Sequence, residues 1–582
     1  MPELLTRWGR ELDPDRPLPD YPRPQLQRDS YLNLNGRWSY AITGLDVDRP
    51  AAWDGEIVVP FSPEAPLSGV NRQLLPDQLL WYRRTVSLPD GFVPHNGRLL
   101  LHFGAVDQTC TVWVNGVEVG GNHGGYLPFA LDVTDALSAR NEIVVRVRDL
   151  SNNAGPSSGK QRLARGGIWY TAQSGIWQTV WAEAVPSAYV ERLDLVPDLA
   201  AGVLAVTVHG RPDPTGTHVT VLDGEVPVAW GTATPGEPTR LRLPEVRPWT
   251  PEDPFRYRVE VSHGGDRVRA HVGMRSFGVG PDEHGHPRLL LNGEPYLQVG
   301  VLDQGYWPDG LLTPPSDDAV VHDIATMKKL GFTMLRKHIK IEPLRFYDHC
   351  DRLGMLVWQD FVNGGAGYRT AAVTWPGQYP IRLRDDTLLG RWVLGRSSAA
   401  GRAEFREELR RTVELLRSVT SLACWVPFNE GWGQFDAAAV TEELRALDPT
   451  RPIDHASGWH DQGAGDVHSL HVYTRRFRVP KRPDTRVLAL TEYGGYDLVT
   501  EGHVWSDKDF GYRHFDDAEA LGEAFAALHH DLGDAVRQGL GALVYTQLCD
   551  VEDELNGLLT YDREVLKLSE HLIRDALRAL RK

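Results

Sequence analysis

The sequence predicts three domains: a β jelly-roll sandwich over residues 1–186, an immunoglobulin-like β-sandwich over residues 187–280 and a (β/α)8 barrel over residues 281–582. Three observations support this prediction. The chain has 582 residues, which is too many for one hydrophobic core. Short alternating segments fill residues 1–280. After residue 280, strand-like apolar runs alternate with helix-like periodic segments.

Residues 1–186 are rich in short segments in which polar and apolar residues alternate. Such segments are typical of half-buried strands. They include GRWSYAI (36–42), LLWYRRTVSL (79–88), RLLLHFGAV (98–106), TCTVWVNGVEV (109–119) and NEIVVRVRDL (141–150). The turn-forming pairs Asp90-Gly91 and Asn115-Gly116 separate them. This pattern predicts a sandwich or jelly roll.

Residues 187–280 form a second, smaller β-rich region. Its predicted strands are LAVTVHG (204–210), HVTVLDG (218–224), RLRLPE (240–245), YRVEVSHG (257–264) and RVRAHVGMRSFGV (267–279). Their number and spacing suit an immunoglobulin-like sandwich of roughly 90 residues. The segment carries no chemical motif, so we expect it to act as a spacer.

Residues 281–582 alternate between predicted strands and helices. The strands are YLQVGVLD (296–303), TMLRKH (333–338), MLVWQDF (355–361), LACWV (422–426), PIDHASG (452–458), VHSLHVY (467–473), VLALTEYGG (487–495) and ALVYTQL (542–548). Helices are predicted near 316–330, 343–353, 402–419, 435–447 and 518–538, and from about 564. Ser316 suits the start of the first helix and Gly331 its end. Eight strands, most followed by a helix, indicate a (β/α)8 barrel.

Net charge and hydropathy exclude several classes of partner. The formal net charge of -16 argues against binding to nucleic acid or to an anionic membrane, since both need a basic surface. No run of about 18 apolar residues occurs, so we expect no membrane-spanning helix. The N-terminus, MPELLTRWGRELDPD, has no apolar signal-peptide core, and we expect a cytoplasmic protein.

Cysteine spacing and the missing motifs argue against a metal or a nucleotide cofactor. Cys110, Cys350, Cys424 and Cys549 lie far apart in the chain, which indicates buried reduced thiols. His468 and His471 are three apart on a predicted strand, so they point to opposite faces and make a poor ligand pair. There is no P-loop or Rossmann fingerprint. We therefore predict no cofactor and no metal, while the 18 tryptophans mildly favour a carbohydrate ligand.

The carboxyl ends of the predicted barrel strands are where a barrel enzyme holds its active site. Two carboxylates stand out there: Glu430 after the fourth strand and Glu492 at the end of the seventh. They would face each other across the mouth, as needed to hold a glycosidic bond between an acid and a nucleophile. Further groups at the strand ends suit sugar hydroxyls and sugar faces. The candidates are Asp303, Arg336, His338, Trp358, Asn429, His471, Tyr473, Tyr545 and Gln547.

The segment 362–400, after the third strand, is too long for a simple turn. Its position on the catalytic face predicts a wall or lid of the pocket. Tyr473, at the end of the sixth strand, is expected to donate a hydrogen bond that keeps Glu492 ionised.

Several motifs resemble those of glycoside hydrolase family 2, the group of retaining β-galactosidases, β-glucuronidases and β-mannosidases. They are SGIWQTVW (174–181), GMRSF (273–277), DRLGMLVWQDF (351–361), PFNEGW (427–432) and TEYGG (491–495). The resemblance implies that Asn429 contacts the sugar 2-hydroxyl, that Glu430 is the acid/base and that Glu492 is the nucleophile. It implies a retaining exo-β-glycosidase that acts on a carbohydrate substrate, and it allows a homo-oligomer.

Departures from the family pattern leave the sugar open. The family often has a histidine after the first barrel strand, where this chain has Leu302-Asp303-Gln304. No Asn-x-Lys occurs, which argues against a β-glucuronidase, and Tyr545 with Gln547 replace the eighth-strand tryptophan of well-known β-galactosidases. A β-galactosidase-like activity is favoured. The alternatives are a β-glucuronidase, β-galacturonidase or β-mannosidase, a transglycosylase, or a non-catalytic carbohydrate-binding protein on the same scaffold.

Overall fold

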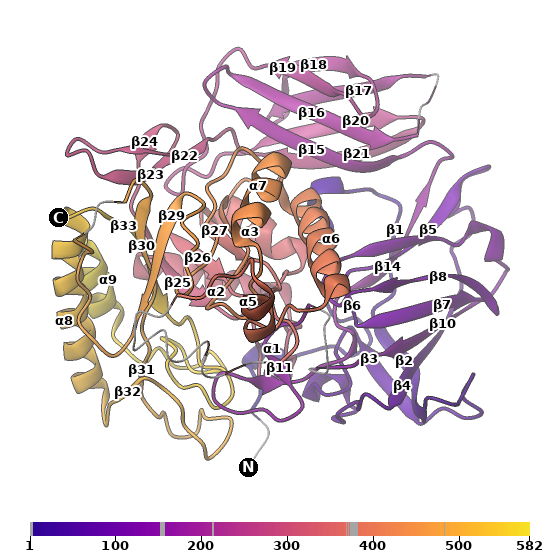
Figure 1. The fold of residues 1–582 in the computed structure, drawn as a ribbon. Helices are drawn as coiled ribbons and strands as arrows, with labels where there is room; N and C mark the ends of the chain where they lie inside the picture. The colour runs from indigo at the N-terminus through magenta and orange to yellow at the C-terminus, as the bar shows by residue number, and fades with distance from the viewer. Residues whose placement is uncertain are drawn as a thin grey trace.

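The structure is a computed structural model. It describes residues 4–151, 157–211, 213, 215–367, 369, 372, 382–481 and 484–581. Figure 1 shows the N-terminal strands on one side, a second group of strands above, and the helices and strands of the C-terminal half on the other side.

The N-terminal region contains two antiparallel sheets that share one core. The larger sheet has the order β3-β2-β4-β10-β7-β8, and the smaller sheet has the order β1-β14-β5-β9. Side chains such as Trp38, Tyr82 and Phe103 fill the space between them. Asn115 (φ 52°) and Gly116 (φ 80°) both adopt the left-handed conformation in the predicted turn between β7 and β8, as a two-residue hairpin turn requires. The strands are β1 (Tyr31–Asn33), β2 (Gly36–Gly44), β3 (Gly55–Val59), β4 (Gln78–Val86), β5 (Arg98–Phe103), β7 (Thr109–Val114), β8 (Val117–His123), β9 (Phe129–Asp132), β10 (Asn141–Arg148) and β14 (Val180–Val185).

A second pair of antiparallel sheets follows, with its own core. One sheet has the order β15-β16-β19 and the other the order β18-β17-β20-β21. Inward residues alternate along the strands, as Tyr257, Val259 and Val261 do on β20. The strands are β15 (Val190–Asp198), β16 (Val203–Gly210), β17 (Thr217–Asp223), β18 (Val226–Ala233), β19 (Pro238–Arg242), β20 (Tyr257–His263) and β21 (Asp266–Val272).

The C-terminal half is built on a seven-stranded parallel sheet of order β28-β27-β26-β25-β33-β30-β29. These strands are β25 (Gln298–Asp303), β26 (Met334–Lys337), β27 (Leu356–Asp360), β28 (Leu422–Val426), β29 (Val467–Val472), β30 (Val487–Gly494) and β33 (Leu540–Thr546). The helices are α2 (Asp317–Leu330), α3 (Leu344–Leu353), α5 (Leu388–Val393), α6 (Ala399–Leu416), α7 (Ala437–Leu447), α8 (Ala518–Arg537) and α9 (Glu570–Ala579). None of the described helices is long and apolar enough to cross a membrane.

The predicted fifth strand, residues 452–458, is not a regular strand, and this part of the prediction is wrong. The segment lies between the two edge strands of the sheet and forms only single bridges, Trp425 with Ile453 and Asn429 with Ser457. Trp425 N donates to Pro452 O at 3.1 Å on one side, and Asp466 N donates to Ile453 O at 2.8 Å on the other. Pro452 has no N–H to extend a ladder. The segment therefore connects the edges of the sheet without continuous strand pairing.

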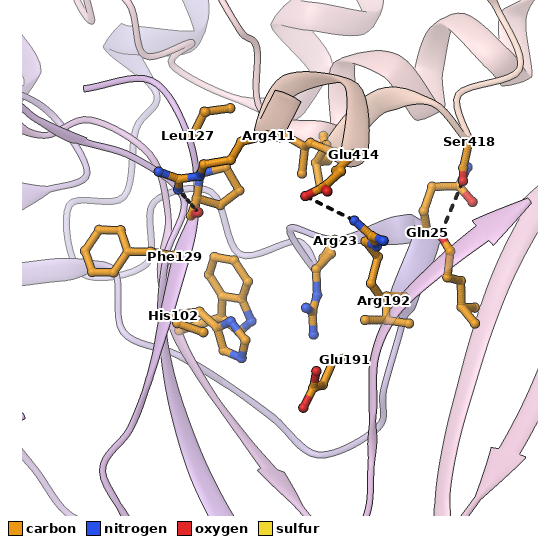
Figure 2. A pocket seen from close by; sticks show the side chains of 17 residues that line it. Arg23, Gln25, His102, Leu127, Phe129, Glu191, Arg192, Arg411, Glu414 and Ser418 are labelled. Atoms are coloured by element: carbon orange, nitrogen blue, oxygen red, sulfur yellow. Dashed lines mark hydrogen bonds and ion pairs between the residues drawn. The ribbon is translucent and has the colours of Figure 1, made fainter. Parts of the chain in front are cut away.

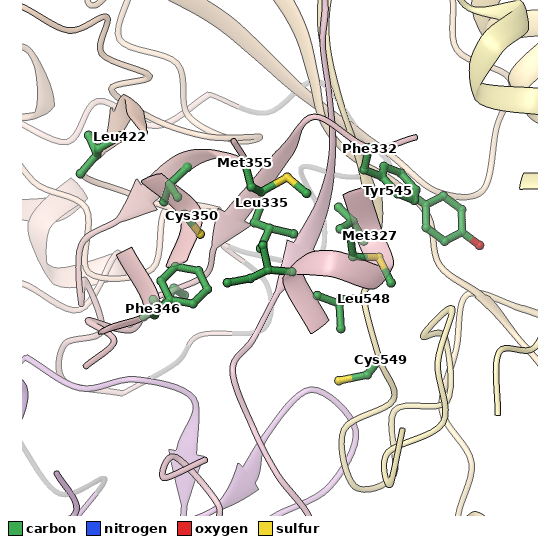
Figure 3. Close-up of a cluster of buried hydrophobic side chains, with 14 of the residues drawn as sticks. Met327, Phe332, Leu335, Phe346, Cys350, Met355, Leu422, Tyr545, Leu548 and Cys549 are labelled. Carbon is green, nitrogen blue, oxygen red and sulfur yellow. The ribbon is translucent and has the colours of Figure 1, made fainter. Parts of the chain in front are cut away.

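Two layers of apolar side chains hold the barrel together. One layer lies between the sheet and its helices, where Met327 of α2, Leu335 of β26 and Cys350 of α3 lie close together (Figure 3). The other fills the inside of the sheet and includes Leu302, Met334 and Val544. The four cysteines are all buried and unpaired, as their spacing indicated.

Trp358 belongs to the inner layer and does not reach the mouth of the barrel, contrary to the sequence prediction. Its side chain is fully buried. Its Nε1 donates to Oε1 of Gln298 at 2.6 Å, and Gln298 is the first residue of β25, so the indole points toward the opposite end of the barrel. Sequence places Trp358 on the strand but does not tell which end its ring occupies.

Replacing Trp358 by phenylalanine should therefore affect stability and not substrate affinity. The variant leaves the buried Oε1 of Gln298 without its donor, which costs about 1–3 kcal/mol. Denaturant unfolding would measure the loss, and KM for a cleaved nitrophenyl glycoside should stay within about twofold of wild type. If the variant had a raised KM and unchanged stability, Trp358 would contact the substrate and the structural interpretation would be wrong.

Candidate active site

Glu430 lies just beyond the carboxyl end of β28 in a strained backbone conformation. Its φ is 51°, a left-handed value that is uncommon for a residue with a side chain. Its backbone N–H donates to Ser457 O at 2.9 Å, so the segment between the sheet edges holds this conformation in place. Strain of this kind concentrates at functional sites, where surrounding contacts maintain it. About 18% of the Glu430 side chain is exposed, which leaves it accessible from the mouth.

Glu492 lies on β30 and is buried. Arg336 Nη1 donates to its Oε1 at 3.2 Å, and the Tyr473 hydroxyl donates to its Oε2. Tyr473 thus makes the hydrogen bond that the sequence predicted. Burial, and then the negative charge of Glu492, raises the pKa of Tyr473 well above its ordinary value, so the phenol keeps its proton and remains a donor.

His471 lies between the two carboxylates. Its Nδ1 is 2.9 Å from Oε1 of Glu430 and 3.4 Å from Oε2 of Glu492, and its Nε2 is 3.0 Å from Ser457 Oγ. One oxygen of each carboxylate and one histidine nitrogen all lie within 4.8 Å of one another. His471 therefore contacts the catalytic candidates directly, where sequence analysis had placed it against the sugar.

The short separation of Glu430 and Glu492 has a chemical consequence. A retaining glycosidase holds its two carboxyl groups about 5–5.5 Å apart, whereas an inverting one needs about 6.5–9.5 Å to admit a water. Oxygens within 4.8 Å fit the first geometry. The same three residues form a set of oxygen and nitrogen atoms that could also bind a cation, so the expectation of no metal stays a prediction.

Arg336 is the buried centre of the site. It donates two hydrogen bonds to Asp360, at 3.0 and 3.1 Å, and one to Asn429 Oδ1 at 2.8 Å. With its contact to Glu492, the guanidinium orders three polar side chains that come from separate strands. The planar fork of arginine suits this multidentate role. Asp360 is the main anionic partner of Arg336.

The electrostatics favour an ionised Glu492. Burial by itself would raise the pKa of Glu492, but the neighbouring His471, and then the positive charges of Arg336 and Lys160, lower it from 4.5 to about 2. A carboxylate that stays ionised is available as a nucleophile.

His338 is in the opposite state, because its environment favours the neutral ring. Burial first, and then the charges of Lys160 and Arg336, lower the pKa of His338 well below its ordinary value. His338 Nδ1 lies 2.7 Å from Asp360 Oδ2. A neutral imidazole protonated on Nδ1 leaves Nε2 as an acceptor, and Nε2 has no hydrogen-bond partner among the described residues. This atom can accept a hydrogen bond from a sugar hydroxyl.

Asp303 and Tyr545 do not reach the site, which corrects two predictions. Asp303 Oδ2 pairs with Lys337 Nζ at 2.7 Å on the outer side of the sheet, since the preceding residue, Leu302, points into the barrel. Tyr545 packs against Phe525 of α8, with ring centres 5.2 Å apart, so it lies between the sheet and that helix.

Gln547 is buried beyond the end of β33. Its Nε2 donates to Asn556 Oδ1 at 2.8 Å, and its Oε1 has no partner among the described residues. A role for Gln547 in sugar binding stays a prediction.

Part of the predicted lid falls outside the described residues, namely 368, 370–371 and 373–381. The described part contributes to the site. Asn363 Nδ2 donates to Trp432 O at 2.7 Å, and Gly364 pairs with Ser158 of the N-terminal region. Trp432 lies edge-on to Trp169, with ring centres 5.2 Å apart. Residues 362–364 therefore form a wall that the N-terminal region completes.

Two further residues of the site were missed from sequence because they lie outside the motifs. Tyr512 stacks on Tyr473 with ring centres 3.7 Å apart and supports the hydrogen bond to Glu492. Lys160, from the N-terminal region, carries a charge that acts on both Glu492 and His338. Neither follows one of the predicted barrel strands, so no sequence signal marked them.

A separate cavity of about 290 Å³ lies between the N-terminal region, β15 and α6 (Figure 2). Two of its arginines are already engaged: Arg192 Nη1 lies 3.2 Å from Glu414 Oε2, and Arg411 donates to Pro128 O. Among the described residues, its lining shares no member with the site around Glu430 and Glu492. This crevice is not the active site.

Two carboxylates this close together at the strand ends of a parallel barrel are typical of barrel glycosidases, and this is the class of protein that the fold and the site indicate. Within that class, the chain is similar to glycoside hydrolase family 2 in two of its regions. The family model described as "Glycosyl hydrolases family 2, sugar binding domain" matches residues 72–181, and the model described as "Glycosyl hydrolases family 2, TIM barrel domain" matches residues 314–484.

Individual relatives are distant. The chain is 27% identical over 503 residues to a β-galactosidase of an Arthrobacter species, covering 79% of this chain and 45% of that protein. It is 25% identical over 558 residues to a β-galactosidase of Photobacterium profundum, covering 85% and 49%. The chain thus spans about half the length of the curated relatives it matches.

Solved structures share the fold across nearly the whole chain. A β-D-glucuronidase of Dictyoglomus thermophilum is 16% identical with a TM-score of 0.74, covering 96% of this chain and 98% of that one. A family 2 β-galacturonidase of Eisenbergiella tayi bound to galacturonate is 18% identical with a TM-score of 0.70, covering 96% and 99%. At this identity the likeness concerns the fold alone.

Proposed function

We propose that the protein is a retaining exo-β-glycosidase that removes a terminal β-linked sugar from oligosaccharides or glycosides. The observation that carries this proposal is the close pair of Glu430 and Glu492, with His471 between them and one oxygen of each within 4.8 Å. Arg336 and Tyr473 stabilise Glu492 as a carboxylate. The Glu430 side chain is 18% exposed and that of Glu492 is 6% exposed, so Glu430 is the more accessible to a leaving group.

The reaction takes two displacements. In the first, a Glu492 oxygen forms a bond to the anomeric carbon while the bond to the leaving oxygen breaks, and Glu430 donates its proton to that oxygen. In the second, Glu430 takes a proton from water, the water oxygen bonds to the anomeric carbon, and the bond to Glu492 breaks. Two inversions give net retention.

The groups around the pair suit a sugar. Asn429 lies next to Glu430 and is oriented by Arg336, so its amide nitrogen is available to a sugar hydroxyl. His338 Nε2 offers an acceptor. Trp432 and Trp169 form an aromatic corner near Glu430, and the Arg162 guanidinium lies over both rings, 4.4 Å from the centre of Trp169 and 5.1 Å from that of Trp432.

The identity of the terminal sugar is a further part of the proposal. The names of the curated relatives support a β-galactoside. The alternatives are a β-glucuronide, a β-galacturonide or a β-mannoside, and a binding protein without activity is the rival from another class. Turnover of nitrophenyl β-glycosides of these sugars and of arabinose distinguishes the alternatives. If the protein binds sugars but cleaves none of these glycosides, a binding protein without activity is favoured.

We also propose that the chain is divided into three domains. Separate cores support a jelly-roll unit up to residue 186, an immunoglobulin-like unit up to residue 280 and a barrel after it. Assembly into a homo-oligomer stays a prediction.

Replacing Glu430 by glutamine should make turnover depend on the leaving group. Without its acid, the variant should lose about 10²–10⁴-fold in kcat/KM on glycosides with poor leaving groups. With dinitrophenyl glycosides, which leave without protonation, the first step should survive and the second become slow. Stopped-flow absorbance should then show a burst of dinitrophenolate followed by slow turnover.

Glu443→Gln is the matched control, because Glu443 lies on α7 in a surface ion pair with Arg406. It should behave as wild type. If Glu430→Gln lost the same factor in kcat/KM on glycosides with good and with poor leaving groups, Glu430 would not be the acid/base.

A further inference from the structure

The cavity shown in Figure 2 lies where three parts of the fold meet. The N-terminal region contributes Phe129 of β9 and Trp181 of β14, the second pair of sheets contributes Leu193 of β15, and the barrel contributes Leu415 of α6. The volume is about 290 Å³. A cavity of about 150 Å³ already holds a benzene ring, so this one has room for a ring with a short substituent.

Apolar side chains form much of the wall of this cavity. The ring of Trp181 stacks on that of His102, with ring centres 4.7 Å apart and planes only 7° from parallel. A wall of this kind packs against the apolar body of a ligand, while a few polar groups fix its orientation. The apolar lining residues are Leu26, Leu127, Pro128, Phe129, Ala130, Trp181, Leu193, Leu344 and Leu415.

Three polar side chains on the wall each leave a nitrogen atom unpaired. Arg23 Nε, Gln25 Nε2 and His102 Nε2 have no hydrogen-bond partner among the described residues. Gln25 Oε1 accepts from His271 N at 3.2 Å, which identifies Nε2 as the unpaired end. His102 Nε2 lies 3.8 Å from Glu183 Oε2, too far for a hydrogen bond. The arginine and glutamine nitrogens can only donate, so the missing partner is an acceptor oxygen.

Two arginines on the wall carry positive charge that the protein compensates only in part. Arg411 donates to Pro128 O at 3.2 Å, and no carboxylate pairs with it in the described part of the chain. Arg23 Nη2 lies 2.7 Å from Glu183 Oε2, but Arg28 Nη1 lies at the same distance from that oxygen. Arg23 therefore shares its anion with a second cation.

The two carboxylates on the wall do not cancel this charge. Glu414 Oε2 lies 3.2 Å from Arg192 Nη1, so these two side chains compensate each other. Glu191 is exposed to solvent, where salt and water screen its charge. Figure 2 shows the Arg23 side chain between His102 on one side and Arg192 on the other. The cavity thus combines an apolar wall with unpaired donors and an excess of positive charge.

We propose that this cavity binds a small aromatic carboxylate. The carboxylate oxygens accept hydrogen bonds from Arg23 and Gln25 and are attracted by the charge of Arg411. The ring packs on the apolar wall beside Trp181, because a flat apolar face suits an aromatic side chain. A ligand held there contacts the N-terminal region, β15 and α6 together. The site lies outside the barrel mouth, and the proposal does not depend on the glycosidase function.

Calorimetric titration of the full chain tests the ring and the charge separately. Wild type should bind trans-cinnamate at least about tenfold more tightly than cinnamamide, which has the same ring but no charge. Acetate, which has the charge but no ring, should bind at least about tenfold more weakly than trans-cinnamate, because it buries little apolar surface. Equal affinity for trans-cinnamate and cinnamamide, or for trans-cinnamate and acetate, would overturn the proposal.

Two charge-removing variants test the arginines. Arg23→Gln and Arg411→Gln should each weaken trans-cinnamate binding by at least about tenfold and leave any cinnamamide binding within about threefold of wild type. Arg411 makes no ion pair among the described residues, so its variant should fold like wild type, as circular dichroism would show. Arg406→Gln is the matched control, because Arg406 lies on α6 and pairs with Glu443 outside the cavity. Wild-type affinity for trans-cinnamate in both Arg23→Gln and Arg411→Gln would reject the site.

A cavity-filling variant tests the location independently of charge. Leu415→Trp places an indole in the space that the ligand would occupy, and it should lose trans-cinnamate binding while its circular dichroism spectrum matches wild type. Binding that persists in Leu415→Trp with unchanged affinity would place the ligand elsewhere and contradict the proposal.

Discussion

Replacing Glu492 by alanine is expected to lower kcat/KM by about four orders of magnitude or more, since no other group can form the covalent intermediate. His471 and Arg336 remain in the variant, so the loss isolates the carboxylate. The fold should survive, because a buried anion and its side chain are removed together. Thermal unfolding and circular dichroism of the variant would check that point.

Chemical rescue makes this result specific to a nucleophile. The space left by Glu492→Ala admits a small anion such as azide, which can attack the anomeric carbon in a single displacement. The product should then be a glycosyl azide of inverted configuration, visible by NMR. Glu501→Ala, at an exposed turn, is the control and should need no rescue. Unchanged hydrolysis by Glu492→Ala would assign the nucleophile elsewhere.

Local sequence signals predicted the elements of this fold well. Ser316 accepts a hydrogen bond from Ala319 N at the start of α2, and Gly331 ends that helix with φ 103°. Both features depend only on neighbouring residues, so the sequence carries them in full. The segment 452–458 was misread because its bonding depends on the two strands beside it, which come from distant parts of the chain.

The site was predicted to the level of strand ends but not of side-chain direction. Glu430 and Glu492 lie where their motifs placed them. Trp358 and Tyr545 were included because they lie close to strand ends, yet one points along the barrel axis and the other toward α8. The direction in which a side chain points depends on the register of its strand in the parallel sheet. Lys160 could not be predicted as part of the site, because it belongs to the N-terminal region and not to the barrel.

Arg336 should have the largest effect on stability of any residue in the site. Replacing it by methionine leaves Asp360 and Glu492 buried without their cation, and breaking such a pair costs about 3–5 kcal/mol. Activity should fall with it, since Asn429 and Glu492 lose the group that orients them. Arg410→Met is the matched control: Arg410 pairs with Glu407 and Glu414 on the surface, where ion pairs contribute about 1 kcal/mol or less.

The pH dependence of this variant follows from the pKa of Glu492. In wild type that pKa is depressed from 4.5 to about 2, so the ionised carboxylate stabilises the fold above pH 4.5 and this contribution is lost as the pH falls toward 2. Removing Arg336 raises the pKa of Glu492. The stability difference between wild type and Arg336→Met should therefore be largest near neutral pH and shrink as the pH falls below 4.5.

The rise in the pKa of Glu492 in Arg336→Met should also be visible in the pH dependence of activity. The acidic limb of the kcat/KM profile follows the ionisation of the nucleophile in the free enzyme, so it should move to higher pH by about one unit or more in Arg336→Met. Arg336→Lys keeps a positive charge but not the planar fork, and it should shift the limb less while still lowering kcat. If Arg336→Met left the acidic limb in place, Arg336 would be a packing residue and the low pKa of Glu492 would have to come from His471.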